Sequence, residues 1–278
     1  MIGLRLGGRR CFLRARPRNL VQVARAAIVT ASDSGIGKAT AIALAAGGYD
    51  VGITWHSDED GANETAAEVR GHGRRAEVRQ LDLLQLPDAA GVVDELSEAL
   101  GGVYALVNNA GISRQAPALE LGYDDWRATL AVDLDGAFLC AQRAARHMVE
   151  AGSGGRIVNV TSVHEHVPLP ESVAYVAAKH GLGGVTKQLA VELGPHGITV
   201  NAVAPGEIAT PMTGNEDVDP HTVDRPGVPA GRPGDAREVA SLIAWLCSDD
   251  AAFTTGASFP IDGGLLLVAA LRNQERGD

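Results

Sequence analysis

From residue 26 onward, short apolar runs alternate with longer segments of helical periodicity, and this alternation restricts the possible folds more than any other feature of the chain. Strands that are separated by helices pair in parallel through right-handed crossovers, and the helices then cover both faces of the sheet. The sequence therefore predicts an α/β protein with a doubly wound parallel sheet. The expected strands are 26–30, 51–55, 76–81, 104–107, 155–161 and 198–203, and the expected helices are 35–46, 58–71, 86–100, 123–151 and 172–193.

Length and composition agree with one folded domain. The chain has 278 residues, of which 45% are hydrophobic, so we expect a single domain over residues 26–270. No run of 18 apolar residues occurs, and no membrane-spanning helix is predicted. Cys11, Cys140 and Cys247 are widely spaced, which indicates neither a disulfide framework nor a zinc site. We therefore expect a cytoplasmic protein.

Charge is distributed unevenly along the chain. Residues 1–25 contain seven arginines and no acidic residue, whereas the other 17 basic residues face 34 acidic ones. An acidic body is not expected to bind nucleic acid. For residues 1–25 we expect a poorly ordered, dispensable extension; a transit-like segment and an RNA-binding arm are the alternatives.

A glycine-containing turn joins the first expected strand to the first expected helix, in the sequence Thr30-Ala-Ser-Asp-Ser-Gly-Ile-Gly37. Gly35 and Gly37 lack the Cβ that would block a close approach to the backbone. The helix that they open presents free amides and a positive dipole end, which suit a pyrophosphate. The turn is thus a candidate dinucleotide-binding site.

Tyr175 and Lys179 stand four residues apart in a chain with only four tyrosines and three lysines. This spacing places both side chains on one helix face, where the ammonium would stabilise the phenolate and make the phenol a usable acid or base. Ser162 lies thirteen residues before Tyr175, where an apolar strand ends. Since ligands bind at the carboxyl ends of parallel strands, Ser162 is placed to hold a substrate oxygen.

Several motifs occur in the same order as in a known family. They are the turn 30–37, Leu81-Asp82-Leu83, Asn108-Asn109-Ala110-Gly111, the set Ser162, Tyr175 and Lys179, Pro205-Gly206 followed by Ile208 and Thr210, and Asp262-Gly263-Gly264. On these motifs the chain resembles the short-chain dehydrogenase/reductase family, whose fold is of the Rossmann type. The segment 162–170 is similar to that of the bacterial glucose 1-dehydrogenase branch.

The resemblance implies hydride transfer between NAD or NADP and a carbonyl or secondary alcohol, with a sugar or another small polar ketone as candidate substrate. It assigns the substrate oxygen to Ser162, the proton to Tyr175, and the nicotinamide ribose to Lys179. Asp133 stands where the family usually has a fourth catalytic residue, an asparagine. The implied cofactor-binding residues are Thr30, Ser32, Gly35, Ile36, Gly37, His56, Ser57, Asp82, Leu83, Asn109, Tyr175, Lys179, Pro205, Gly206 and Ile208.

The resemblance also implies a homotetramer that assembles through helices 123–151 and 172–193. Small residues on the first of these helices would permit close packing between subunits: Gly136, Ala137, Ala141, Ala144 and Ala145. Asp133 on the same helix should point inward toward Lys179. Residues 207–234, rich in proline, glycine and aspartate, are expected to form a mobile lid over the substrate.

Three positions leave the cofactor and the activity open. Ala31 replaces the first glycine of the family motif, and this replacement is expected to be tolerable only if Ala31 keeps φ below zero. Thr54 occupies the position where an NAD enzyme tends to carry a carboxylate, which favours NADP with dual use possible, while Asp33 argues mildly for NAD. If Ala31 and Asp133 are marks of decay, the chain is instead a catalytically weak dinucleotide-binding regulatory or interaction protein.

His164 and His166 raise the question of a metal site. In an extended loop the two side chains would point the same way, but no third ligand is evident, so no metal is expected. The resemblance implies instead that they form a polar wall of the substrate pocket. Trp55, Trp126 and Trp245 lie in apolar segments and are interpreted as packing residues.

Overall fold

The fold is centred on a seven-stranded parallel sheet, seen in a computed structural model that describes residues 25–214 and 218–268. Its strand order is β3-β2-β1-β4-β5-β6-β9, so the doubly wound, Rossmann-type prediction is confirmed. The strands are β1 (Ala26–Val29), β2 (Asp50–Trp55), β3 (Ala76–Gln80), β4 (Ala105–Asn108), β5 (Gly155–Val160), β6 (Ile198–Pro205) and β9 (Ser258–Ile261).

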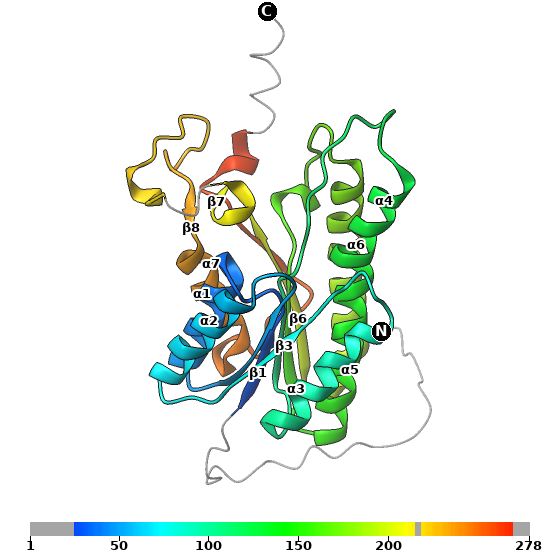
Figure 1. The fold of residues 1–278 in the computed structure, drawn as a ribbon, viewed down its shortest axis with the longest axis vertical. Helices are drawn as coiled ribbons and strands as arrows, with labels where there is room; N and C mark the ends of the chain where they lie inside the picture. Colours follow the sequence, from blue (N-terminus) through cyan, green and yellow to red (C-terminus); the bar gives the residue numbers. More distant parts are fainter. Residues whose placement is uncertain (1–24, 215–217, 269–278) are drawn as a thin grey trace, which may run out of the picture.

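Helices cover both faces of the sheet (Figure 1). One face carries α1 (Gly35–Ala46), α2 (Glu59–Gly71) and α7 (Ala236–Cys247). The other carries α3 (Val92–Leu100), α5 (Ala137–Ala151) and α6 (Val173–Leu193), with α4 (Tyr123–Leu130) against α6. The two helical layers explain why the central strands are apolar on both sides.

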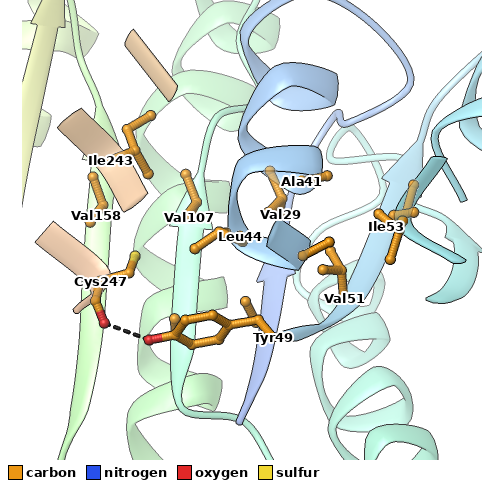
Figure 2. Packing of buried hydrophobic residues seen from close by; sticks show 14 of the residues in the cluster. Val29, Ala41, Leu44, Tyr49, Val51, Ile53, Val107, Val158, Ile243 and Cys247 are labelled. Atoms are coloured by element: carbon orange, nitrogen blue, oxygen red, sulfur yellow. Dashed lines mark hydrogen bonds between the residues drawn. The ribbon is translucent and has the colours of Figure 1, made fainter. Parts of the chain in front are cut away.

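Alternate residues of the central strands β1, β4, β5 and β6 supply the two cores. In β1, Val29 packs beneath α1 while Ile28 packs on the opposite face against Leu96 and its neighbours. Tyr49 closes the first core from below, where its hydroxyl donates to the backbone oxygen of Cys247 at 2.7 Å (Figure 2). Burial of an aliphatic side chain such as Val29 or Ile28 stabilises the fold by roughly 1.5–3 kcal/mol relative to leaving that side chain exposed.

The helix expected over 123–151 is interrupted. A π-helical segment, Ala131–Gly136, separates α4 from α5 and contains Asp133. A 3₁₀ turn at Asp88–Gly91 likewise precedes α3 inside the expected helix 86–100. Apolar periodicity does not distinguish these hydrogen-bond patterns, because side chains still fall on one side of the chain.

The small residues proposed for a subunit interface are buried within the chain itself, so that expectation is wrong. Ala141 and Ala144 on α5 are fully buried, and an added Cβ at Gly136 would lie 2.9 Å from the Leu83 side chain. The others, Ala137 and Ala145, are 6% exposed. Their small size lets α5 approach the sheet. The outward face of α5 instead exposes Phe138 and Val149.

Segment 207–234 is tied down at both ends. Its first residues form β7 (Ile208–Ala209), which pairs in parallel with β8 (Gly234–Asp235). Arg225 also donates to the Glu207 carboxylate at 2.7 Å. A lid would have to move between these anchors, and its mobility stays a prediction.

Arg25 is the first residue described. Its guanidinium bonds to Asp249 at 2.9 Å and lies 4.0 Å from the ring centre of Tyr104. The prediction for the extension otherwise concerns residues 1–24, which lie outside the described residues. Within the described part of the chain, none of the helices has the length and apolar character needed to cross a membrane.

Candidate active site

The strand order reverses at β1, which has β2 on one side and β4 on the other. In an open α/β sheet, such a switch point creates a crevice at the carboxyl ends of the strands. A pocket of about 370 Å³ lies there, lined by the turn after β1, the ends of β2 and β3, residues 109–112 and Arg114. The topology alone thus places a ligand site beside the glycine turn.

The glycine turn fits a bound pyrophosphate. Gly35 has φ +52°, and an added Cβ would meet the Thr210 side chain at 3.3 Å. Gly37 packs so closely that an added Cβ would lie 2.1 Å from the Ala31 oxygen. Ser34, the N-cap of α1, makes no side-chain cap, so the first-turn amides are available to an anion.

Ala31 adopts φ +48°, so the expectation that alanine is tolerable here only at negative φ is wrong. A left-handed conformation at a non-glycine residue costs on the order of 1–3 kcal/mol. Two contacts hold it: the Ala31 amide donates to Thr54 Oγ1 at 3.0 Å, and the Ala31 oxygen accepts from Asn109 Nδ2 at 2.9 Å. The turn therefore keeps the shape of the glycine motif at the expense of backbone strain.

Thr30 and Ser32 brace the turn from behind the pocket wall. Thr30 Oγ1 accepts the backbone amides of Asn109 and Ala110, each at 2.9 Å. Ser32 is fully buried, donates to the Val29 oxygen at 2.8 Å, and accepts the Thr54 amide. Thr30 thus joins the turn to the segment after β4, and Ser32 joins it to β1 and β2.

The pocket wall contains seven of the residues predicted to bind cofactor: Gly35, Ile36, His56, Ser57, Asp82, Leu83 and Asn109. The wall does not include Thr30, Ser32, Gly37, Pro205, Gly206, Ile208, Tyr175 or Lys179. Gly206 packs against the backbone of Asp262, and Ile208 is buried. Sequence reasoning missed Arg114, Val132, Pro211 and Met212, which reach the wall from distant parts of the chain.

At the end of β2, the side chain of Thr54 is buried, and its hydroxyl accepts the Ala31 amide, so it supports the glycine turn. The next three residues, Trp55, His56 and Ser57, line the pocket. His56 Nε2 lies 3.6 Å from an Asp82 oxygen. Asp33 also lines this end of the pocket, and burial, reinforced by neighbouring Asp58, raises its pKa. Hydrogen-bond donors and carboxylates therefore share the region where a ribose would lie.

Two of the catalytic candidates, Asp133 and Lys179, lie directly behind the pocket wall. An added Cβ at Gly111, a wall residue, would be 3.2 Å from Asp133 and 3.3 Å from Lys179 Nζ. Lys179 Nζ is 5.4 Å from the centre of the Tyr175 ring and donates to the Val160 oxygen at 3.3 Å. The one-turn spacing on α6 does bring the ammonium to the phenol.

Asp133 points inward, as predicted, and pairs with Lys179 at 3.2 Å. Its other oxygen accepts the Ile112 amide at 2.8 Å. Burial alone would lower the pKa of Lys179, but Asp133 and then Tyr175 outweigh burial and hold that pKa above its usual value. The lysine therefore stays charged beside the phenol. Burial also raises the pKa of Asp133, against the opposing effect of Lys179.

Ser162 follows β5 and caps a short 3₁₀ turn, Val163–Glu165, by accepting the His164 amide at 3.1 Å. Because Ser162 Oγ is the acceptor in this bond, its own proton remains available for a substrate oxygen. The His164 ring contacts the Tyr175 ring edge to face, with centroids 6.4 Å apart. His164 thus connects the serine turn to the tyrosine.

His164 and His166 lie on a 3₁₀ turn and at its end, not on an extended loop as expected. His164 Nδ1 contacts the Val167 oxygen at 3.2 Å, while His166 Nε2 contacts Ser258 Oγ at 3.3 Å. The two rings therefore serve different neighbours. Over residues 25–214 and 218–268, no group of three His, Cys, Asp or Glu side chains is placed to hold a metal ion.

A family model described as enoyl-(acyl carrier protein) reductase matches residues 30–266. The chain belongs to the short-chain dehydrogenase/reductase family. YohF of Escherichia coli strain K12, an uncharacterised oxidoreductase, is 56% identical over 91% of this chain and 100% of its own length. Glucose 1-dehydrogenase 2 of Bacillus subtilis is 34% identical over 87% of this chain and 95% of its own length.

Solved structures of the family extend the comparison. An acetoin dehydrogenase from Enterobacter cloacae is 57% identical, with a TM-score of 0.84 over 88% of this chain and 97% of that one. A dehydrogenase from Agrobacterium tumefaciens contains NADP, at 34% identity and a TM-score of 0.78 over 87% and 96% of the two chains. Carveol dehydrogenase from Mycobacterium avium contains NAD, at 28% identity and a TM-score of 0.79 over 88% and 99%.

The protein is accordingly an NAD(P)-dependent oxidoreductase that acts on alcohol or carbonyl groups. The nicotinamide, when bound, supplies or accepts the hydride. The glycine turn and the amides of α1 are the residues that fit the pyrophosphate.

Proposed function

We propose that this enzyme interconverts a small, polar hydroxy-ketone and the corresponding diol. Ser162 donates a hydrogen bond to the reacting oxygen, and Tyr175 gives up or takes the proton of that oxygen. Lys179, held charged by Asp133, stabilises the phenolate. The intact arrangement of Tyr175, Lys179 and Asp133 behind the pocket is the main support for this assignment.

The environment of His164 is a second argument for a polar substrate. The Val167 oxygen can only accept, so His164 Nδ1 carries the proton of their contact, and Nε2 is left as an acceptor. Burial lowers the pKa of His164, which favours this neutral form. An acceptor on a ring that touches Tyr175 suits a second hydroxyl next to the reacting carbon. The name of the Enterobacter cloacae relative, acetoin dehydrogenase, is consistent with such a substrate.

The central experiment compares wild type with Tyr175→Phe against acetoin, sugars, diketones and 3-oxoacyl thioesters, using both cofactors. We expect Tyr175→Phe to lose more than nine-tenths of kcat while cofactor affinity, measured by fluorescence titration, stays within a few fold.

His164→Phe should raise KM for hydroxy-ketones by about tenfold, because a factor of this size corresponds to the loss of one hydrogen bond. The same variant should change KM for simple ketones little. Cofactor binding without turnover of any substrate would instead favour the regulatory alternative.

Preference for NADP over NAD is part of the proposal. His56 and Ser57 can donate hydrogen bonds to a 2′-phosphate, and His56 is well exposed. Asp33 and Asp82 on the same wall oppose that phosphate, so we expect a modest preference with use of both cofactors. Initial rates with each cofactor test this, and a more than tenfold preference for NAD in kcat/KM would contradict it.

We also propose a cytoplasmic homotetramer. Cys140 and Cys247 are free and buried. Exposed apolar side chains on the outward faces of α5 and α6, namely Phe138, Val149, Val173 and Val191, offer surface for subunit contacts.

A further inference from the structure

Glu165 is a buried carboxylate close to the catalytic serine. Its side chain is only 5% exposed, although glutamate is rarely buried without partners. It lies three residues after Ser162, at the end of the turn that Ser162 caps. The catalytic roles assigned above do not use this carboxylate.

Two hydroxyls satisfy Glu165. Oε2 accepts from Thr161 Oγ1 at 2.7 Å and from Ser258 Oγ at 2.9 Å. Thr161 Oγ1 also lies 3.1 Å from the Val203 oxygen, but its single proton favours the closer, charged Glu165 oxygen. Since the Ser258 proton goes to Glu165, His166 Nε2 acts as donor to Ser258 in their 3.3 Å contact.

These bonds bracket Ser162 on both sides. Thr161 immediately precedes Ser162, and the Glu165 amide donates to the Ser162 oxygen at 2.8 Å. The carboxylate therefore ties together the two ends of the five-residue segment 161–165 that carries the catalytic hydroxyl.

The same carboxylate sets the distance to α6. Gly183, one turn beyond Lys179, faces it so closely that an added Cβ would lie 2.3 Å from Glu165 Oε1. Through Ser258 it also reaches β9, at the edge of the sheet. One buried group thus joins the serine turn, the tyrosine helix and the edge strand.

We propose that Glu165 is a positioning residue of the active site: it fixes the segment that presents Ser162 at the correct distance from Tyr175 on α6. The inference rests on the proposed function, because positioning matters only if Ser162 holds the reacting oxygen. Misplacement by about 1 Å can reduce turnover by as much as about 100-fold.

The test uses Glu165→Ala and Glu165→Gln in the full-length protein, with Asp50→Ala as matched control. Asp50 is also a buried carboxylate, but it pairs with Arg74 and Arg75 at the amino end of β2, away from the pocket. We expect Glu165→Ala to lower kcat by about 10- to 100-fold, with cofactor Kd within twofold. Glu165→Gln, whose amide oxygen can still accept from both hydroxyls, should retain kcat within a few fold, and Asp50→Ala should lose stability without this loss of kcat.

A Glu165→Ala variant that is folded and keeps kcat within twofold of wild type would overturn the inference. If Glu165→Ala does not fold, Ser258→Ala and Thr161→Val each remove one of the two hydrogen bonds to the Glu165 carboxylate. Unchanged kcat in both of these variants would also overturn the inference. Hydrogen exchange of the backbone amides of residues 162–166 can be measured without a substrate. Exchange that is faster than in wild type in Glu165→Ala, but not in Asp50→Ala, supports the inference. Exchange in Glu165→Ala at the wild-type rate refutes it. Wild type that turns over no substrate refutes the proposed function instead, so the two failures are distinguishable.

Discussion

At the scale of single residues, Ala31 and Asp133 are where this chain departs from its family's motif, and the structure gives each a physical role. Ala31 accepts a left-handed conformation that glycine would adopt freely. Asp133 replaces a neutral amide with a charge beside Lys179.

Replacement of Ala31 by glycine tests the strain in the turn. Glycine removes the penalty of positive φ but adds about 0.4–1 kcal/mol of unfolded-state entropy. We expect Ala31→Gly to match or exceed wild-type stability, by up to about 2 kcal/mol in urea denaturation. Ala31→Val, which adds β-branching at the same φ, should be less stable than wild type. A glycine variant less stable than wild type would show that the strain is compensated elsewhere.

Replacement of Asp133 by asparagine tests the charge next to Lys179. The carboxylate raises the pKa of Lys179 and offsets the positive potential that favours the phenolate. In Asp133→Asn, Lys179 keeps its contacts with the Tyr175 ring and the Val160 oxygen. If these contacts keep the lysine charged, the potential at the phenol becomes more positive, and the alkaline-side rise of the oxidation rate should move to lower pH with activity retained. An unchanged pH profile of kcat would place Asp133 outside proton transfer.

The precise shape of the site was beyond sequence reasoning at this scale. The spacing of Tyr175 and Lys179 predicted their contact, because one helical turn fixes it. The orientation of the Thr54 side chain was not predictable, because its hydroxyl on β2 accepts the amide of Ala31, which follows β1 and is distant in the sequence. Arg114 and Met212 reach the pocket through long-range folding that no local pattern encodes.

At the scale of elements, α7 and β9 were missed from the sequence, although α7 has a readable start. Asp235 and Glu238 form a capping box in which Asp235 accepts from the first turn and Glu238 accepts the Asp235 amide at 2.8 Å. Val239, Ile243 and Leu246 then repeat at helical spacing and are buried. β9 has only four residues, too few for alternation to identify.

The cap of α7 gives a pH-dependent contribution to stability. The hydrogen bonds from Arg232, then from the Asp235 amide, lower the pKa of Glu238 to about 2. A lowered pKa in the folded state stabilises the fold above the unfolded value of about 4.3, and this contribution is lost as pH falls toward 2. Because Glu238 is 43% exposed, solvent screening keeps the effect small.

Urea denaturation of Glu238→Gln and wild type at several pH values checks this expectation. The stability difference should be largest at pH 7 and should shrink below about pH 4. Glu192→Gln on α6 is the control for loss of a surface charge, since Glu192 contacts Gln188 and no arginine. A difference that is independent of pH would mean that the cap does not depend on the charge of Glu238.

At the scale of the whole molecule, the fold class followed from the alternation of strands and helices, because a parallel sheet needs a covering helix at each crossover. The subunit contacts did not follow in the same way. Small residues along one side of a helix are expected both where the helix packs on its own sheet and where it packs on another subunit. In α5 the small residues pack on the sheet of the same chain.

The proposed homotetramer predicts a light-scattering mass of four times the 28.8 kDa chain. Phe138→Glu on the outward face of α5 should lower that mass, because it places a charge among apolar contacts. Lys187→Glu, a charge change at an exposed site on α6, is the comparison. A monomeric wild type at micromolar concentration would contradict the proposal.

The bond between Glu165 and Ser258 spans 93 residues of chain. At 5–20 residues per second, a ribosome adds the second partner roughly 5–20 s after the first. During that interval the Glu165 carboxylate can bond to Thr161 but not to Ser258 on β9. In a nascent chain the segment that carries Ser162 would thus be fixed to the edge of the sheet only after the last strand, β9, has been made.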